Sequence, residues 1–142
     1  MSVHTLYGLN RLTRGPERMS TPYEIIGQEE GVKALAGAFY AAMDELEQAE
    51  SVRRMHAENL DVIQQKLFEY LNGWLGGPHL YKDKYGTICL TEPHQPYPIG
   101  EDQRDQWVAC WDRALEKVDA PEEFRSMTKE PIYRMANFLI NQ

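Results

Sequence analysis

Apolar side chains recur three or four positions apart along most of the chain, the spacing that places them on one face of a helix. This pattern predicts four long amphipathic helices, over residues 28–49, 59–75, 101–118 and 121–139. Their apolar faces include Val32, Leu35, Phe39, Tyr40, Met43, Leu60, Ile63, Leu67, Trp74, Trp107, Cys110, Trp111, Leu115, Phe124, Ile132, Met135 and Leu139. Because no paired alternating segments emerge, the fold class is all-α.

The helix ends are marked by capping residues. Thr21, Pro22 and Glu24 have the spacing of a capping box with proline at the first helical position, and Gly27 ends that short helix. Residues 51–55 predict one further helical turn. Asp119 is the expected cap of the last helix, and Pro131 predicts a kink or a restart within it.

The helical period is lost between Gly76-Gly77-Pro78 and Gly100. Residues 81–86 are polar and turn-like, and residues 88–90 predict a brief extended piece. The segment Glu92–Ile99 then holds one histidine, His94, among three prolines, which excludes an ordinary helix or a central strand. A long irregular connection in a small domain is typical of a functional loop.

Length and charge narrow the class of protein. The 142 residues predict an N-terminal extension over residues 1–21, with a helical turn around Val3–Leu9, and one domain over residues 22–142. With no apolar run of membrane-spanning length and no secretory signal, we expect a cytoplasmic protein without a membrane partner. The net charge of −7 argues against nucleic-acid binding.

Candidate chemistry centres on His94. No nucleotide-binding, zinc-protease or serine-hydrolase motif is present. Cys89 and Cys110 form no CxxC pair and are expected to be free thiols. Cys89, His79 and His94 give only part of a zinc site, and a cysteine nucleophile lacks an orienting partner. The residues alone therefore leave two interpretations of His94, a ligand held by prolines or an incidental histidine in a stiff surface loop.

Several features, taken in order, resemble the truncated haemoglobins, most closely the second group of that family. The resemblance covers roughly Tyr23 to Asn141. The Phe39-Tyr40 pair looks like the pair on the family's B helix, and residues 74–78 match the aromatic, Gly-Gly-Pro end of its E helix.

The second half of the chain continues the resemblance. Tyr81 follows Pro78 by three residues, as in the family, and residues 94–99 resemble its His-x-Pro-aromatic-x-Ile proximal segment. Trp107 lies thirteen residues beyond His94, at the place of the group's G-helix tryptophan. The N-terminal extension, Pro131 and the reduced glycines near Gly27 depart from the family pattern.

The resemblance implies a two-on-two helical sandwich that holds haem b, with His94 as the proximal iron ligand. It makes Tyr40 and Trp107 hydrogen-bond donors to the bound gas, with His56 at the variable corner before the E helix. Ile63 stands where many globins place a distal histidine. Lys66 and Tyr81 would contact the haem propionates, with Arg104 as a weaker candidate. The full implied set is His94, Phe39, Tyr40, His56, Ile63, Lys66, Leu67, Tyr81, Tyr97, Ile99 and Trp107.

Three functions stay open on this basis. The first is reversible binding of dioxygen and other diatomic ligands such as CO and NO, as in an oxygen-transport protein of a bacterium. The second is a redox enzyme, either peroxidase-like or a nitric oxide dioxygenase, and the third is a helical interaction module without haem. A pocket rich in donors suits slow gas release, and hence chemistry or sensing more than bulk transport. Partners would be the gases and a reductase, and the chain would be a monomer or a weak homodimer.

Overall fold

The computed structural model describes residues 20–142, and within that range it contains helices and no strand. The helical turn predicted around Val3–Leu9 and most of the predicted extension lie outside the described residues. In chain order the elements are α2 (Pro22–Ile26), α3 (Gln28–Glu45), the 3₁₀ turn η1 (Glu47–Ala49), α4 (Glu50–Arg54), α5 (Asp61–Trp74), α6 (Leu80–Tyr85), α7 (Thr91–His94), α8 (Glu101–Lys117) and α9 (Glu122–Phe138).

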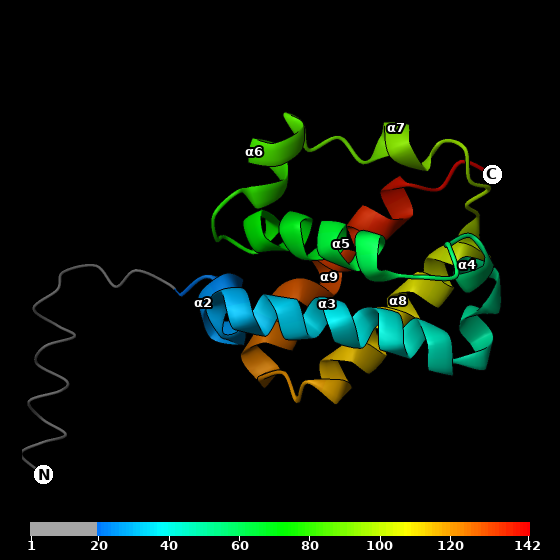
Figure 1. The fold of residues 1–142 in the computed structure, drawn as a ribbon. Coiled ribbons are helices and arrows are strands. Elements are labelled where there is room, and N and C mark those ends of the chain that lie inside the picture. Colours follow the sequence, from blue (N-terminus) through cyan, green and yellow to red (C-terminus); the bar gives the residue numbers. More distant parts are fainter. Residues whose placement is uncertain (1–19) are drawn as a thin grey trace, which may run out of the picture.

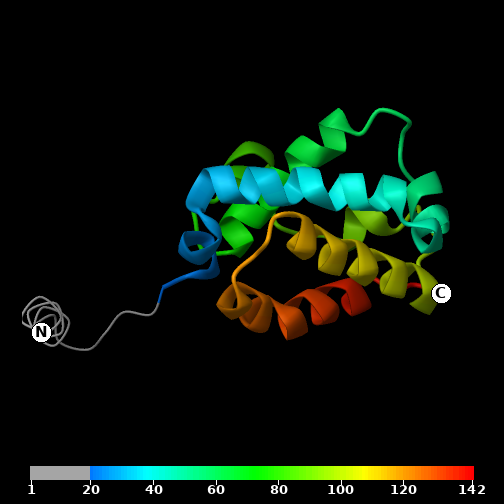
Figure 2. The same cartoon turned by 90° about the horizontal axis from the view of Figure 1, so that it is seen from below.

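The four long helices form two pairs. Helix α3 packs against α5 and against α8, and α8 packs against α9. Figure 1 shows α6 and α7 on the far side of α5, and Figure 2 shows α3 lying over the pair α8 and α9. This is the two-on-two arrangement that the resemblance implies. No helix in residues 20–142 is long and apolar enough to cross a membrane.

Aromatic rings join the two layers through the core. Trp107 stacks on Trp111 with ring centroids 6.3 Å apart, and Trp111 stacks on Phe124 of α9 at 6.4 Å. Phe39 of α3 contacts Trp107 at 4.9 Å. Phe39, Trp111 and Phe124 are fully buried, and aromatic burial of this size dominates core energetics. Phe39 and Trp107 are thus packed against one buried aromatic cluster.

Helix α2 docks at the end of α5. The Thr21 capping box forms as predicted, since Thr21 Oγ1 accepts from Glu24 N at 3.1 Å and Thr21 N donates to Glu24 Oε1 at 2.9 Å. The Tyr23 ring then lies so near Gly77 that a Cβ atom there would be 2.4 Å from Tyr23 Cε1. The Gly-Gly-Pro stop therefore ends α5 and also admits the Tyr23 ring.

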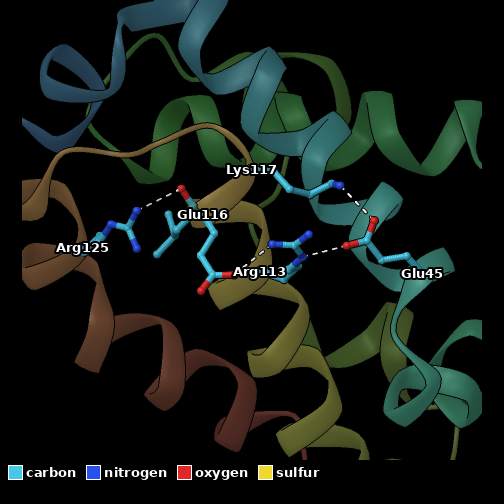
Figure 3. Close-up of polar contacts among 6 residues, drawn as sticks. Glu45, Arg113, Glu116, Lys117 and Arg125 are labelled. Atoms are coloured by element: carbon cyan, nitrogen blue, oxygen red, sulfur yellow. Dashed lines mark hydrogen bonds and ion pairs between the residues drawn. The ribbon is translucent and has the colours of Figure 1, made fainter.

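A surface network ties the end of α3 to α8, the helices that carry Tyr40 and Trp107. Figure 3 shows Arg113 donating to Glu45 at 2.7 Å and to Glu116 at 3.1 Å, while Lys117 donates to Glu45 at 2.9 Å. Arg125 of α9 donates to the backbone oxygen of Leu115 at 3.3 Å. Exposed ion pairs add little stability singly, but this network orients three helix ends together.

Several local predictions were wrong. The helix from Gln28 ends at Glu45 rather than Ala49, and η1 completes the span. Asp119 does not cap α9, because its φ of 51° turns the chain and Pro121 takes the cap position. Pro131 lies inside the single helix α9, so the predicted restart does not occur, while the alternative of a kink stays a prediction.

The connection between α5 and α8 is more helical than predicted. Residues 80–85 form α6, which ends at Gly86 in the left-handed region with φ 76°. Residues 88–90 form no strand. The four residues Thr91–His94 form α7, so His94 ends a helical turn rather than lying in an irregular loop. Pro93 is tolerated there because the first turn of a helix needs no backbone donor.

Candidate functional site

A cavity of about 490 Å³ lies between α5, α8 and the 86–100 connection, closed at one end by α9. Its volume is within the range of pockets that hold cofactors and drug-sized ligands. Of the eleven residues implied by the resemblance, ten line it: Tyr40, His56, Ile63, Lys66, Leu67, Tyr81, His94, Tyr97, Ile99 and Trp107. Phe39 does not line the cavity but supports the wall from behind.

The His94 ring is fixed by a local hydrogen bond. Its Nδ1 lies 2.5 Å from the Leu90 backbone oxygen, one helical turn earlier. A carbonyl oxygen can only accept, so Nδ1 carries the proton and Nε2 keeps its lone pair. The imidazole lines the cavity. The ring is thus in the tautomer that a metal ligand through Nε2 requires, with the outer hydrogen bond that orients such ligands.

The segment that follows His94 is held by hydrogen bonds from Asn141 to Tyr97 and Ile99. Asn141 Nδ2 donates to the Tyr97 oxygen at 2.9 Å, and Asn141 Oδ1 accepts from Ile99 N at 2.9 Å. The backbone N–H of Asn141 also donates to the Ile99 oxygen at 2.8 Å. Asn141 was not predicted as a site residue, because no local sequence signal marks a contact between residues more than forty positions apart.

The opposite wall presents hydrogen-bond donors. The Tyr40 side chain is only 6% exposed, and its ring meets Phe39 edge-on at 5.0 Å. Burial, and next the nearby Cys110 thiol, raise the pKa of Tyr40, so the phenol stays protonated and can donate. Within residues 20–142 neither the Tyr40 hydroxyl nor the Trp107 N–H has a hydrogen-bond partner, which leaves both free for a ligand.

His56 lines the cavity and presents an acceptor to it. Its Nδ1 contacts the Val52 backbone oxygen at 2.8 Å, so Nδ1 carries the proton and Nε2 is an acceptor. Burial lowers the pKa of His56, its bond to Val52 partly offsets this, and the charges of Arg53 and His94 lower it further. The neutral ring lies 5.7 Å from that of Tyr40. His56 can therefore accept a hydrogen bond in the pocket, while Tyr40 and Trp107 are the donors.

Two cationic side chains, Arg104 and Lys66, lie at the rim of the cavity and differ in the partners they have. Arg104 is engaged, with bonds to Asp105 at 2.9 Å and Asn137 at 2.8 Å and its guanidinium over the Tyr133 ring at 5.1 Å. Lys66 has no carboxylate partner within the part of the chain that the structure describes. Lys66 is therefore the better placed cation for an anionic group at the rim.

These residues fit a haem. Two imidazoles with a free Nε2, those of His94 and His56, line the cavity together with the apolar walls from Ile63 and Leu67. With Lys66, which has no carboxylate partner among residues 20–142, at the rim, this lining suits a flat apolar macrocycle with carboxylate edges. No group of three His, Cys, Asp or Glu side chains among residues 20–142 could hold a metal ion by itself. Cys89 is exposed and Cys110 is buried, and both are free thiols. The arrangement supports a metal carried by a cofactor.

Other residues of the cavity were not predicted as site residues. Tyr70, Met55 and Val62 lie on its α4 and α5 sides, and Met135 and Leu139 close it from α9. The apolar spacing of Tyr70, Met135 and Leu139 predicted helix faces, and such a pattern does not separate a core position from a cavity lining. Met55 and Val62 belong to no predicted face.

Comparisons with known proteins agree with this geometry. The family model "Bacterial-like globin" matches residues 21–141. The group 2 truncated hemoglobin YjbI of Bacillus subtilis (strain 168) is 28% identical over 126 residues, 89% of this chain and 92% of that protein. The cold-adapted truncated hemoglobin of Pseudoalteromonas haloplanktis TAC125 is 41% identical with a TM-score of 0.83, over 87% of this chain and 99% of the other. The group II 2-on-2 hemoglobin of Agrobacterium tumefaciens is 36% identical with a TM-score of 0.83, over 89% and 98%.

Proposed function

The chain belongs to the bacterial-like globin family, and from that premise we propose that it binds dioxygen reversibly at a haem b whose proximal ligand is His94. Family membership makes the chain a haem-containing, oxygen-binding protein. The identity of the axial residue and of the haem type is our proposal. The observation that carries it is the 2.5 Å contact between His94 Nδ1 and the Leu90 oxygen, which leaves Nε2 as a lone-pair donor.

Haem b fits better than a covalently attached haem. Covalent attachment of c-type haem uses a C-x-x-C-H motif, and the sequence contains none. Binding then rests on apolar contact with Ile63, Leu67 and Ile99, on His94, and on polar contacts at the rim. Lys66 and Tyr81 are the residues that would hold the propionate groups.

When bound, haem would supply an iron atom that takes dioxygen, CO or NO. The chain's own residues set the dissociation rate of the bound gas. Tyr40 and Trp107 each offer a donor into the cavity, and a donor held in a buried site stabilises negative charge on a ligand. His56 presents an acceptor rather than a further donor, so the two donors are Tyr40 and Trp107. This set supports slow release of dioxygen.

The relatives favour gas binding over enzymatic turnover as the primary function. YjbI of Bacillus subtilis is named as a group 2 truncated hemoglobin, and its name states no reaction. Turnover of peroxide or of nitric oxide would also need a source of electrons, for which a reductase is the expected partner. We propose a monomer or weak homodimer as the working state.

An absorption spectrum of the purified protein tests the proposal. We expect a Soret band in the ferric form and distinct ferrous, dioxygen and carbonyl spectra. Dioxygen binding should be reversed by removing the gas. A protein that stays colourless after haem is supplied would contradict the proposal and favour a helical interaction module. Six-coordinate bands of the ferrous form without added ligand would show that an internal side chain occupies the distal position.

A further inference from the structure

Three tyrosines form a continuous path from the cavity to the surface, at the end where α5 packs on α6. Tyr70 and Tyr81 line the cavity, and their ring centroids lie 5.5 Å apart. Tyr81 in turn contacts Tyr85 at 4.5 Å. Tyr85 is 40% exposed, so a molecule in solution can reach the outer ring of a path whose inner rings face the candidate haem.

The path has a buried carboxylate beside it. Glu69 is 6% exposed, and its Oε2 accepts from Lys84 Nζ at 3.1 Å and from Gln65 Nε2 at 3.1 Å. Its other oxygen, Oε1, is buried and has no partner among residues 20–142. A buried acceptor without a donor is unusual in a folded protein and calls for an explanation.

Glu69 acts electrostatically on the path. Burial raises the pKa of Tyr81, and the neighbouring Tyr85 and Glu69 raise it further. Lys84 also places this carboxylate beside the path, because its Nζ lies 3.1 Å from Glu69 Oε2 and 5.4 Å from the Tyr85 ring centroid. Loss of an electron makes a phenol a very strong acid, so an oxidisable tyrosine needs a nearby base. The open Oε1 lone pairs supply one.

We propose that Tyr81 and Tyr85 form an electron-transfer route between the haem cavity and the surface, with Glu69 as the proton acceptor and a small anionic one-electron reductant as the donor at Tyr85. The route rests on the proposed haem. It deepens that function, because an oxygen-binding haem protein is exposed to hydrogen peroxide formed from reduced oxygen.

The electrons and protons balance as follows. Hydrogen peroxide takes up two electrons from the holoprotein and two protons from solvent and becomes two molecules of water. Tyr81 supplies one electron at a time, and its phenolic proton passes to Glu69. Tyr85 then gives Tyr81 an electron and releases its own proton to solvent, while Glu69 returns the proton to Tyr81. A reductant such as ascorbate gives Tyr85 an electron and a proton and leaves as its own radical.

Charge at the outer ring selects the donor. Lys84 Nζ and Lys66 Nζ lie 5.4 Å and 5.7 Å from the Tyr85 ring centroid. Because Lys84 is paired with Glu69, Lys66 supplies the positive charge that attracts an anion to Tyr85 on a chain with a net charge of −7. Tyr133 is a matched comparison, since it is 42% exposed but does not line the cavity and has no aromatic partner within residues 20–142.

Spin trapping on the holoprotein tests the route. Haem-loaded protein is mixed with hydrogen peroxide and a nitroso spin trap, and peptide mass spectrometry locates the adducts. We expect the adduct on Tyr85 and little on Tyr133. Tyr81→Phe should remove most of the Tyr85 adduct and speed haem bleaching severalfold, Glu69→Gln should lower the adduct, and ascorbate should suppress it. Tyr133→Phe should change none of these.

The opposite results overturn the proposal. Equal adducts on Tyr85 and Tyr133 would mean that exposure alone selects the site, and an unchanged Tyr85 adduct in Tyr81→Phe would exclude Tyr81 as the intermediate. Adduct yields are normalised to the Soret band, so loss of haem is not mistaken for loss of the route. A wild-type protein without a Soret band would contradict the proposed haem function itself. A protein that binds haem and dioxygen without a Tyr85 radical would contradict the route alone.

Discussion

Asn141 forms hydrogen bonds with both backbone polar groups of Ile99, the N–H and the carbonyl oxygen. The Asn141 N–H donates to the Ile99 oxygen at 2.8 Å, and Asn141 Oδ1 accepts from the Ile99 N–H at 2.9 Å. The side-chain amide adds a bond to Tyr97 at 2.9 Å. The second-last residue of the chain therefore fixes the segment that follows His94 and limits how far His94 can move.

Asn141→Ala should loosen this segment. The substitution leaves the Ile99 N–H and the Tyr97 oxygen without their side-chain partner, at a cost of about 1–3 kcal/mol for each group that stays buried. We expect faster transfer of haem to an acceptor apoprotein and a shifted iron–histidine stretching band in the Raman spectrum. Gln142→Ala, which removes a side chain bonded only to Asn141, is the matched control. A lower melting temperature with unchanged haem transfer would limit Asn141 to a structural role.

Tyr40→Phe and Trp107→Phe should each speed the release of dioxygen. Each change removes one donor from the cavity while keeping an aromatic ring in the wall. A neutral hydrogen bond contributes about 0.5–1.5 kcal/mol, which corresponds to a roughly two- to tenfold rise in the dissociation rate. Stopped-flow displacement of dioxygen by CO measures it, with Tyr133→Phe as the control. Unchanged dissociation rates in both variants would mean that neither side chain slows the release of dioxygen.

Acid should destabilise the protein partly through His56. Its pKa is lowered in the folded chain, mainly by burial, so the unfolded chain binds this proton more readily. The stabilising contribution is therefore present above the ordinary histidine pKa of about 6.5 and is lost as pH falls through the lower pKa of the folded state.

His56→Gln removes that titration. We expect the free energy of unfolding of the wild-type protein to fall more between about pH 7.5 and about pH 5 than that of the variant. Urea unfolding at both pH values measures the difference. Equal losses in the two proteins would mean that His56 binds its proton equally well in both states.

The long helices were predictable because each buries one continuous stripe of apolar side chains. A stripe of this kind recurs with a 3.6-residue period, which is visible in the sequence. The Thr21 capping box and the Gly76-Gly77-Pro78 stop were predictable for the same local reason, since their residue types fix the backbone. Helices α6 and α7 were missed because they are six and four residues long and bury too little for a period to emerge.

The site was predictable only through the family resemblance. Periodicity places Tyr40, Ile63 and Trp107 on buried faces but does not reveal that they share a cavity with His94. The tautomer of His56 depends on a contact with Val52 that the sequence does not predict. The clamp by Asn141 and the open oxygen of Glu69 depend on tertiary packing, so no local pattern could reveal them.

The central claim, that His94 Nε2 is the axial ligand of the haem, is tested most directly by His94→Gly with and without added imidazole. Matched His79→Gly serves as the control, because His79 is exposed and lies outside the cavity. We expect His94→Gly to lose the iron–histidine Raman band and most of its haem, imidazole to restore both, and His79→Gly to keep both. A His94→Gly protein that retains its haem and its iron–histidine band without imidazole would contradict the account.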